Sequence, residues 1–391
     1  MVVHLGDYIY EHGPDAYAGE TGKRLGRNHD PAHEIVSLDD YRKRHAQYKS
    51  DEGSLAMHAR HPLIVIWDDH DSANNSWMGG ARNHQSDEGS WQSRRSASVR
   101  AFFEWLPIRD PANVIDQVNY WRHYKFGNLV SLITLESRLT GRSQQISYDK
   151  NLPLLKTKQQ AEEFLHSMVG NPKRTMLSKP MENFLSSEFE ESIASSRRWR
   201  IIGSASVMAK SIDPNLDDDF FKQLEKQLTG DNLEMLEEHI HLGKLNLPAD
   251  LDAWDGYPAA REKFYQLAKD KGVEDLLVIS GDSHSYWVNE LYDNDGQSMG
   301  VELGTTGITS PRSIMSLGIE AMKRYDELNA ANNKEIVWSD GSHRGFIKLN
   351  INHKMAHADF IAVSTVESQD YTTDIVYSVD IINSEGHLSY K

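Results

Sequence analysis

Three short apolar stretches that run directly into carboxylate and imidazole side chains constrain this chain more than any other feature. They are VVHLGDYIYEHG (residues 2–13), LIVIWDDHDSANN (63–75) and LLVISGDSHSYW (276–287). Each reads as a strand followed by a polar loop. In open α/β sheets, ligands bind outside the carboxyl ends of strands. Three such ends would therefore bring together an acidic cluster that also carries imidazole.

Strand patterns alternate with helical patterns along the whole chain. Apolar runs rich in Val and Ile predict strands at 2–5, 63–67, 129–135, 199–202, 276–280 and 346–351. Helical patterns cover 156–168, 220–241 with a break at Thr229-Gly230, 258–271 and 312–329. This alternation is typical of the α/β class. We expect one domain over 1–391, with the polar stretch at about 139–200 inserted over one face.

Composition excludes several functions. The net charge of −16 and the lack of a basic block argue against nucleic-acid binding. No apolar run approaches the roughly 20 residues of a membrane helix. The chain has no cysteine, so a metal ion must be held by oxygen and by the imidazoles of its 18 histidines.

Clustered carboxylates favour a bound metal ion. Carboxylates close together repel one another and their pKa values rise unless a cation compensates. Carboxylate, phenol and imidazole together suit iron(III), manganese, zinc or calcium. Taken singly, each motif has a structural alternative, because an Asp after a strand commonly closes a turn. Asp68 or Asp71 could equally cap a following helix.

Tyr10 and Arg138 indicate which metal ion and which substrate group such a site could bind. A phenol ionises with a pKa near 10, so it ligates a strong Lewis acid such as ferric iron. The alternative is that Tyr10, like Tyr8, is a packed strand aromatic. Arg138 follows the strand-like run LVSLITLESR and could bind phosphate oxygens through its planar fork. Its alternative is a salt bridge, for example to Glu136.

The segments HLGDYIYEHG, WDDHDSANNSW, GDSHSYWVNEL, DGYPAAREKFYQL and VELGTTGITSP resemble the PhoD-like alkaline phosphatases, which are calcineurin-like metallophosphoesterases. The resemblance extends from Val2 to about Leu349. It implies an α/β fold, specifically a four-layer αββα sandwich of mixed sheets. It also implies hydrolysis of phosphate mono- or diesters by a metal-activated hydroxide, with two or more metal ions that are often iron and calcium.

The resemblance also implies roles for single residues. The implied metal ligands are Asp7, which bridges the metals, Tyr10, Asp69, Asp282 and His284. His70 is implied to contact the phosphate or protonate the leaving group, and Arg138 to stabilise the phosphoryl oxygens. Asn74 and Asn75 are implied to contact phosphate or support the ligands.

The chain departs from the family pattern at its start. Members normally carry a β-rich domain, an export signal and an earlier strand whose Cys ligates iron, and we expect all of these to be missing here. Manganese or zinc is then an alternative to iron. An exposed edge beside Val2 would favour a homodimer. The family is usually exported, whereas the chain as it stands reads as cytoplasmic. The alternative to a phosphoesterase is an impaired or inactive remnant that binds phosphate or metal.

Overall fold

The structure of the protein, a computed structural model, describes residues 1–16, 19–111 and 113–391. The chain clusters into two compact units. Unit 1 comprises Met1–Arg122, Thr134–Gln144 and Leu177–Met181, and unit 2 comprises His123–Ile133, Gln145–Met176 and Glu182–Lys391. The prediction of one domain over 1–391 is not decided by this division and stays a prediction.

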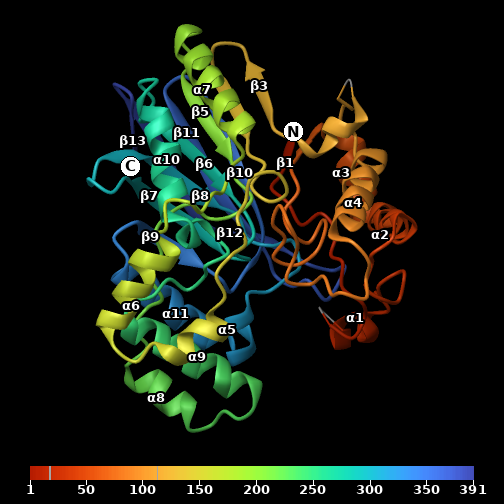
Figure 1. Cartoon of the computed structure of the whole chain (residues 1–391), viewed down its shortest axis with the longest axis vertical. Helices are drawn as coiled ribbons and strands as arrows, with labels where there is room; N and C mark the ends of the chain where they lie inside the picture. Colours follow the sequence, from red (N-terminus) through yellow and green to blue (C-terminus); the bar gives the residue numbers. More distant parts are fainter. Residues whose placement is uncertain (17–18, 112) are drawn as a thin grey trace. The chain divides into compact units, whose positions relative to one another are not determined.

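Unit 1 contains a short parallel pair of strands, β1 (Val2–His4) and β2 (Leu63–Val65), in which Val2 pairs with Leu63. Its helices are α1 (Gly19–Leu25), α2 (Leu38–Ser50), α3 (Glu52–Arg60), α4 (Trp91–Trp105) and the 3₁₀ helix η1 (Val114–Val118) (Figure 1). In the core of this unit, the rings of Trp67, Phe102 and Tyr120 pack with centroids 5.2 to 5.8 Å apart. The core supports β2, which leads directly into the second polar loop.

Unit 2 contains two sheets. The seven-stranded sheet has the order β3-β4-β5-β6-β8-β7-β9, and the four-stranded antiparallel sheet has the order β10-β11-β12-β13. The strands are β3 (Arg122–Phe126), β4 (Val130–Thr134), β5 (Trp199–Gly203), β6 (Leu276–Ser280), β7 (Tyr286–Tyr292), β8 (Ser298–Gly304), β9 (Ile336–Asp340), β10 (Arg344–Ile351), β11 (Met355–Val363), β12 (Thr373–Ser384) and β13 (His387–Tyr390). Strands β5, β6 and β8 run parallel, and β7 is antiparallel to both of its neighbours.

The helical segments that lie wholly or mainly in unit 2 connect these strands. They are α5 (Tyr148–Asn151), η2 (Leu152–Leu154), α6 (Lys158–Phe164), the π-helix η3 (Leu165–Val169), α7 (Lys179–Ala194), α8 (Asp219–Glu225), α9 (Asp231–Leu245), η4 (Trp254–Gly256), α10 (Pro258–Lys269), η5 (Ser313–Leu317) and α11 (Ile319–Asn332). Helices α7 and α10 pack against each other through Phe189 and Phe264, whose rings lie 6.2 Å apart. Figure 1 shows both helices beside β5 and β6.

Aromatic side chains join the two sheets of unit 2. Trp338 of β9 stacks on Tyr377 of β12 with ring centroids 4.3 Å apart, and Phe360 of β11 meets Tyr286 of β7 edge-on at 5.3 Å. The sheets thus pack face to face with an apolar interior, as in other sheet sandwiches. The predicted fold class, α/β with a sandwich of mixed sheets, is confirmed.

The predicted elements recur with shifted ends. All six predicted strands are present, as β1, β2, β4, β5, β6 and β10. The helical pattern over 220–241 is divided into α8 and α9, and Gly230 adopts a φ of +59° at the predicted break. The pattern over 312–329 is also divided, because Gly318 adopts a φ of +99° between η5 and α11.

The structure bears on two further predictions, the lack of a membrane-spanning helix and the exposed edge of β1. Among the described residues, no helix combines the length and the apolar character needed to cross a membrane. Strand β1 has β2 as its one strand partner in the described part of the chain, and the homodimer through its other edge stays a prediction.

Candidate metal centre

The backbone after β1 passes very close to the segment after β2. Gly6 adopts a φ of +111°, and a Cβ placed there would lie 2.4 Å from the Cβ of Asp68. Asp7 then adopts a φ of +56°. Glycine tolerates this conformation and leaves room for such an approach. Gly6 therefore allows the two polar segments of unit 1 to meet.

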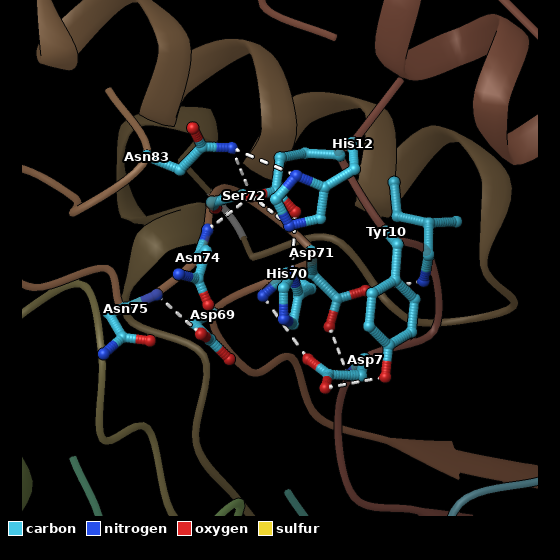
Figure 2. A network of polar contacts seen from close by, with 12 residues as sticks. Asp7, Tyr10, His12, Asp69, His70, Asp71, Ser72, Asn74, Asn75 and Asn83 are labelled. Atoms are coloured by element: carbon cyan, nitrogen blue, oxygen red, sulfur yellow. Dashed lines mark hydrogen bonds and ion pairs between the residues drawn. The ribbon is translucent and has the colours of Figure 1, made fainter. Parts of the chain in front are cut away.

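Four of the predicted residues gather where these segments meet. Asp7, Asp69 and His70 each offer a potential ligand atom, and these atoms lie within 4.8 Å of one another. The Tyr10 hydroxyl donates to Asp7 Oδ2 at 3.2 Å, and the Tyr10 and His70 rings lie 4.4 Å apart (Figure 2). Both polar segments of unit 1 thus contribute to one cluster.

The surroundings of one oxygen atom, Asp69 Oδ1, show whether the cluster suits a metal ion. Asp69 Oδ1 is buried and accepts no hydrogen bond within the described part of the chain, while Arg138 Nη2 lies 3.5 Å away. A buried charged oxygen without a hydrogen bond is costly, and a cation would remove that cost. The nearby carboxylate, phenol and imidazole are ligands for iron, manganese, zinc or calcium. The residues therefore fit a metal ion.

The pKa values of the clustered carboxylates also indicate that a cation would stabilise this cluster. Burial raises the pKa of Asp7 well above its usual value, the His70 imidazole opposes this, and the carboxylates of Asp69 and Asp68 add to the rise. Burial also acts to raise the pKa of Asp69, but Arg138 and His70 outweigh it and the pKa is lowered. Without a cation, the crowded carboxylates do not all ionise readily.

Glu11 is a member of the centre that the sequence analysis did not identify. Its side chain is fully buried, and one of its oxygens lies 2.7 Å from His70 Nδ1. The other oxygen accepts from the backbone N–H of Asn74 at 2.7 Å and from Asn83 Nδ2 at 2.8 Å. The signal available in the sequence is its position, one residue after Tyr10 in a segment that already carries ligands.

Glu11 and His70 change each other's ionisation. Burial opposes the charged form of Glu11, yet the charge and hydrogen bond of His70 outweigh burial and lower the pKa of Glu11 to about 2. Burial acts to lower the pKa of His70, but Asp69, Glu11 and Asp7 together raise it well above its usual value. His12 joins these two residues in a second group of potential ligands within 4.8 Å.

Arg138 is fully buried, and its guanidinium forms a bidentate fork of two hydrogen bonds with the carboxylate of Asp68. Its Nε donates to Asp68 Oδ1 at 2.5 Å and its Nη2 to Asp68 Oδ2 at 3.1 Å. Glu136 accepts from the backbone N–H groups of Arg138 at 2.9 Å and Leu139 at 2.6 Å, which folds the turn after β4. The guanidinium thus hydrogen-bonds Asp68 and forms an ion pair with Asp69 at 3.5 Å. Its contact with phosphate stays a prediction.

Asn74 and Asn75 hold the loop through their backbone. The N–H of Asn74 bonds to Glu11, and the N–H of Asn75 donates to Asp69 Oδ2 at 2.6 Å. Asn75 adopts a φ of +51°, a conformation that asparagine tolerates better than most residues. Contact of the two side chains with substrate stays a prediction.

Asp282 and His284 lie in unit 2, in the loop after β6. Both adopt left-handed backbone conformations, with φ values of +64° and +56°. His284 Nδ1 lies 3.0 Å from the carbonyl oxygen of Pro311, a contact that fixes the orientation of the imidazole ring. Their predicted convergence with the ligands of unit 1 stays a prediction.

Comparison with known proteins gives a consistent result. The profile of the family described as PhoD-like phosphatase matches residues 1–360. Alkaline phosphatase D of Bacillus subtilis (strain 168) is 31% identical over 366 residues, which cover 92% of this chain and 54% of that protein. A solved structure titled "Structure of PhoD" superposes with a TM-score of 0.72 at 26% identity, covering 100% of this chain and 65% of the other. The chain thus spans between about half and two thirds of the length of these relatives.

Proposed function

The chain belongs to the PhoD-like phosphatase family, and from this premise we propose that it hydrolyses phosphate esters at the centre formed by Asp7, Asp69 and His70. The observation that carries the proposal is the buried Asp69 Oδ1, which has no hydrogen bond in the described residues and lies among ligand atoms within 4.8 Å of one another. The proposed substrate is a small phosphate ester.

Two or more metal ions are part of the proposal. Asp7, Tyr10 and Asp69 would hold them in unit 1, with Asp282 and His284 as the proposed ligands from unit 2. Iron and calcium follow the family pattern, and manganese or zinc are alternatives because the chain lacks cysteine. When bound, such ions lower the pKa of an attacking water and neutralise charge on the phosphoryl group.

His70 is the proposed acid for the leaving group. Glu11 is a carboxylate with a pKa lowered to about 2, so it accepts a hydrogen bond and Nδ1 of His70 carries the proton. Nε2 of His70 is then the atom that would contact a phosphoryl oxygen or protonate the departing alkoxide. Although burial opposes them, Asp69, Glu11 and Asp7 together raise the pKa of the imidazole, and a raised pKa favours the protonated form that a general acid needs.

Arg138, Asn74 and Asn75 complete the proposed substrate site. Because the Arg138 fork is engaged with Asp68, its positive charge would act on the phosphoryl group through space. A buried charge acts through a lower dielectric than water and so over a longer distance. Asn74 and Asn75 lie four and five residues after His70 in the same loop, and their side chains are proposed to contact phosphate oxygens.

The test is the release of p-nitrophenolate at alkaline pH from p-nitrophenyl phosphate, the monoester, and from bis(p-nitrophenyl) phosphate, the diester. The protein is assayed with iron plus calcium, with manganese, with zinc and after chelation, beside Asp7→Asn as the control variant. We expect release that depends on metal and is lost in the control variant. A folded protein that releases no p-nitrophenolate from either ester with any metal would overturn the proposal and favour an inactive member of the family.

A further inference from the structure

The carboxylate of Asp71 binds backbone amides from both polar segments of unit 1. Its Oδ2 accepts from the N–H groups of Asp7 and Asp68, each at 2.9 Å. Its Oδ1 accepts from the N–H groups of Tyr8 at 3.1 Å and Ile9 at 3.3 Å. The side chain is only 3% exposed (Figure 2). One buried carboxylate therefore joins the backbone of the Asp7 segment to that of the Asp68 segment.

These bonds act where the backbone is unusual. Three successive N–H groups, from Asp7 to Ile9, turn toward one anion, which is the arrangement of a backbone anion nest. The turn requires the left-handed conformation of Asp7, with its φ of +56°. An aspartate in this conformation is strained, so it persists only where its surroundings hold it. Asp71 supplies such surroundings.

We propose that Asp71 is a positioning residue, which orients Asp7 toward Asp69 and His70 before any cation arrives. The inference rests on the proposed function, since it concerns the same centre. Asp71 offers both of its oxygens to amides, so its contribution acts through the backbone of the Asp7 segment. Loss of its carboxylate would leave Asp7 present but wrongly directed.

A matched control distinguishes positioning from general stability. Asp293 is another buried carboxylate, 2% exposed, in the turn between β7 and β8. It accepts from the N–H groups of Asp295 at 3.0 Å and Gln297 at 2.8 Å, and from Lys269 at 2.7 Å. All of these partners lie in unit 2. Asp293→Asn should therefore lower stability without changing the Asp7 segment.

The experiment compares Asp71→Asn, Asp71→Ser and Asp293→Asn with the unchanged chain after chelation. Mn²⁺ alone is titrated by calorimetry, and circular dichroism checks folding. Loss of residues that orient metal ligands typically weakens metal binding about 10- to 100-fold, and we expect this for the folded Asp71 variants. Asp293→Asn should bind Mn²⁺ within about threefold of the unchanged chain. Unchanged Mn²⁺ affinity in a folded Asp71 variant would overturn the proposal.

Hydrogen exchange gives a second readout that needs no variant. In the metal-free unchanged chain, we expect the amides of residues 7–9 to be protected already, because Asp71 holds them. If they exchange freely until Mn²⁺ is added, the cation orders the turn and the proposal fails. These readouts are separate from hydrolysis. Protection of residues 7–9 together with weakened Mn²⁺ binding in the variants would support the positioning role even if no phosphate ester were cleaved.

Discussion

Nδ1 of His70 lies 2.7 Å from a carboxylate oxygen of Glu11, although the two residues are 59 positions apart in the sequence. Both side chains are buried, and the pKa of Glu11 is lowered to about 2 while that of His70 is raised. A buried, ionised carboxylate beside an imidazole fixes its tautomer and stabilises its charged form. The pair therefore links the position of His70 to its protonation.

Glu11→Gln keeps the shape of the side chain but removes its charge. The pKa of His70 should fall, because Glu11 is one of the groups that raise it. We expect at least about tenfold slower ester hydrolysis and an alkaline limb of the pH–rate profile that moves to lower pH. Steady-state assays across pH measure both effects. Glu104→Gln removes an exposed ion pair with Arg42 in the same unit and should leave the profile unchanged. An identical profile in Glu11→Gln would contradict the role given to the pair.

Arg138→Lys breaks the fork onto Asp68. Lysine places one charge where two parallel hydrogen bonds stood, and Asp68 is nearly inaccessible to water. Lysine keeps the positive charge but loses at least one of the two hydrogen bonds to the carboxylate, and such a bond contributes about 1.5–3 kcal/mol, so we expect the free energy of unfolding in urea to fall by about 2 kcal/mol. If stability is unchanged and only KM for the ester rises, Arg138 acts by contacting substrate, and the structural role is wrong.

His45 should make unit 1 sensitive to acid. Its ring is fully buried, neither ring nitrogen has a hydrogen-bond partner in the described residues, and burial, with a smaller contribution from Lys49, lowers its pKa to about 3. The unfolded chain, with a histidine pKa of roughly 6.5, takes up the proton first. The free energy of unfolding therefore falls as pH drops from about 6.5 toward 3.

Replacing the ring isolates this effect. His45→Phe keeps an aromatic side chain beside Tyr8 and Phe102 but does not titrate. Between pH 7 and pH 5, the melting temperature of the metal-free variant should fall less than that of the unchanged chain. His353→Phe, at an exposed position, serves as the control. Parallel curves for the unchanged chain and His45→Phe would show that acid acts elsewhere.

Gly6→Ala should damage the centre through the backbone. The added methyl would lie 2.4 Å from the Cβ of Asp68, at a φ of +111° that alanine rarely adopts. Strain and overpacking together should cost at least about 2 kcal/mol, and the Asp7 and Asp69 segments should separate. Thermal unfolding and Mn²⁺ titration measure the two consequences. Gly26→Ala, at a φ of +67° with open space around it, is strained without the clash and should keep its Mn²⁺ affinity.

Much of the fold follows from local patterns. Runs of Val and Ile flanked by turn residues predict β1, β2, β5 and β6. In β6 the apolar run is continuous because the strand is buried on both faces. Strand β8 gives no such signal, since it carries Gly300 and the buried Glu302. Glu302 is accommodated by the backbone N–H groups of Met208 at 2.7 Å and Ala209 at 3.0 Å. Those partners come from a distant segment, which local sequence does not reveal.

The residues of the candidate metal centre also differ in whether local sequence predicts them. Asp7, Tyr10, Asp69 and His70 are predictable because each follows a strand end. Glu11 is not predictable in this way, because its hydrogen-bond partners, His70, Asn74 and Asn83, lie more than 50 positions away in the sequence. For Arg138, the sequence left two readings open, phosphate binding and a salt bridge, for example to Glu136. The burial of Arg138 depends on Asp68, which lies 70 positions away.

Unit 1 is assembled from three separate pieces of chain, so the polypeptide passes between the units at five points, after residues 122, 133, 144, 176 and 181. No single splice could therefore transfer one unit intact to another protein. A chain nicked after residue 122 would still be joined within unit 1 by the Arg138–Asp68 fork and by the bond from Trp67 to Glu136. The interleaved path makes the molecule suited to fragment complementation rather than to modular exchange.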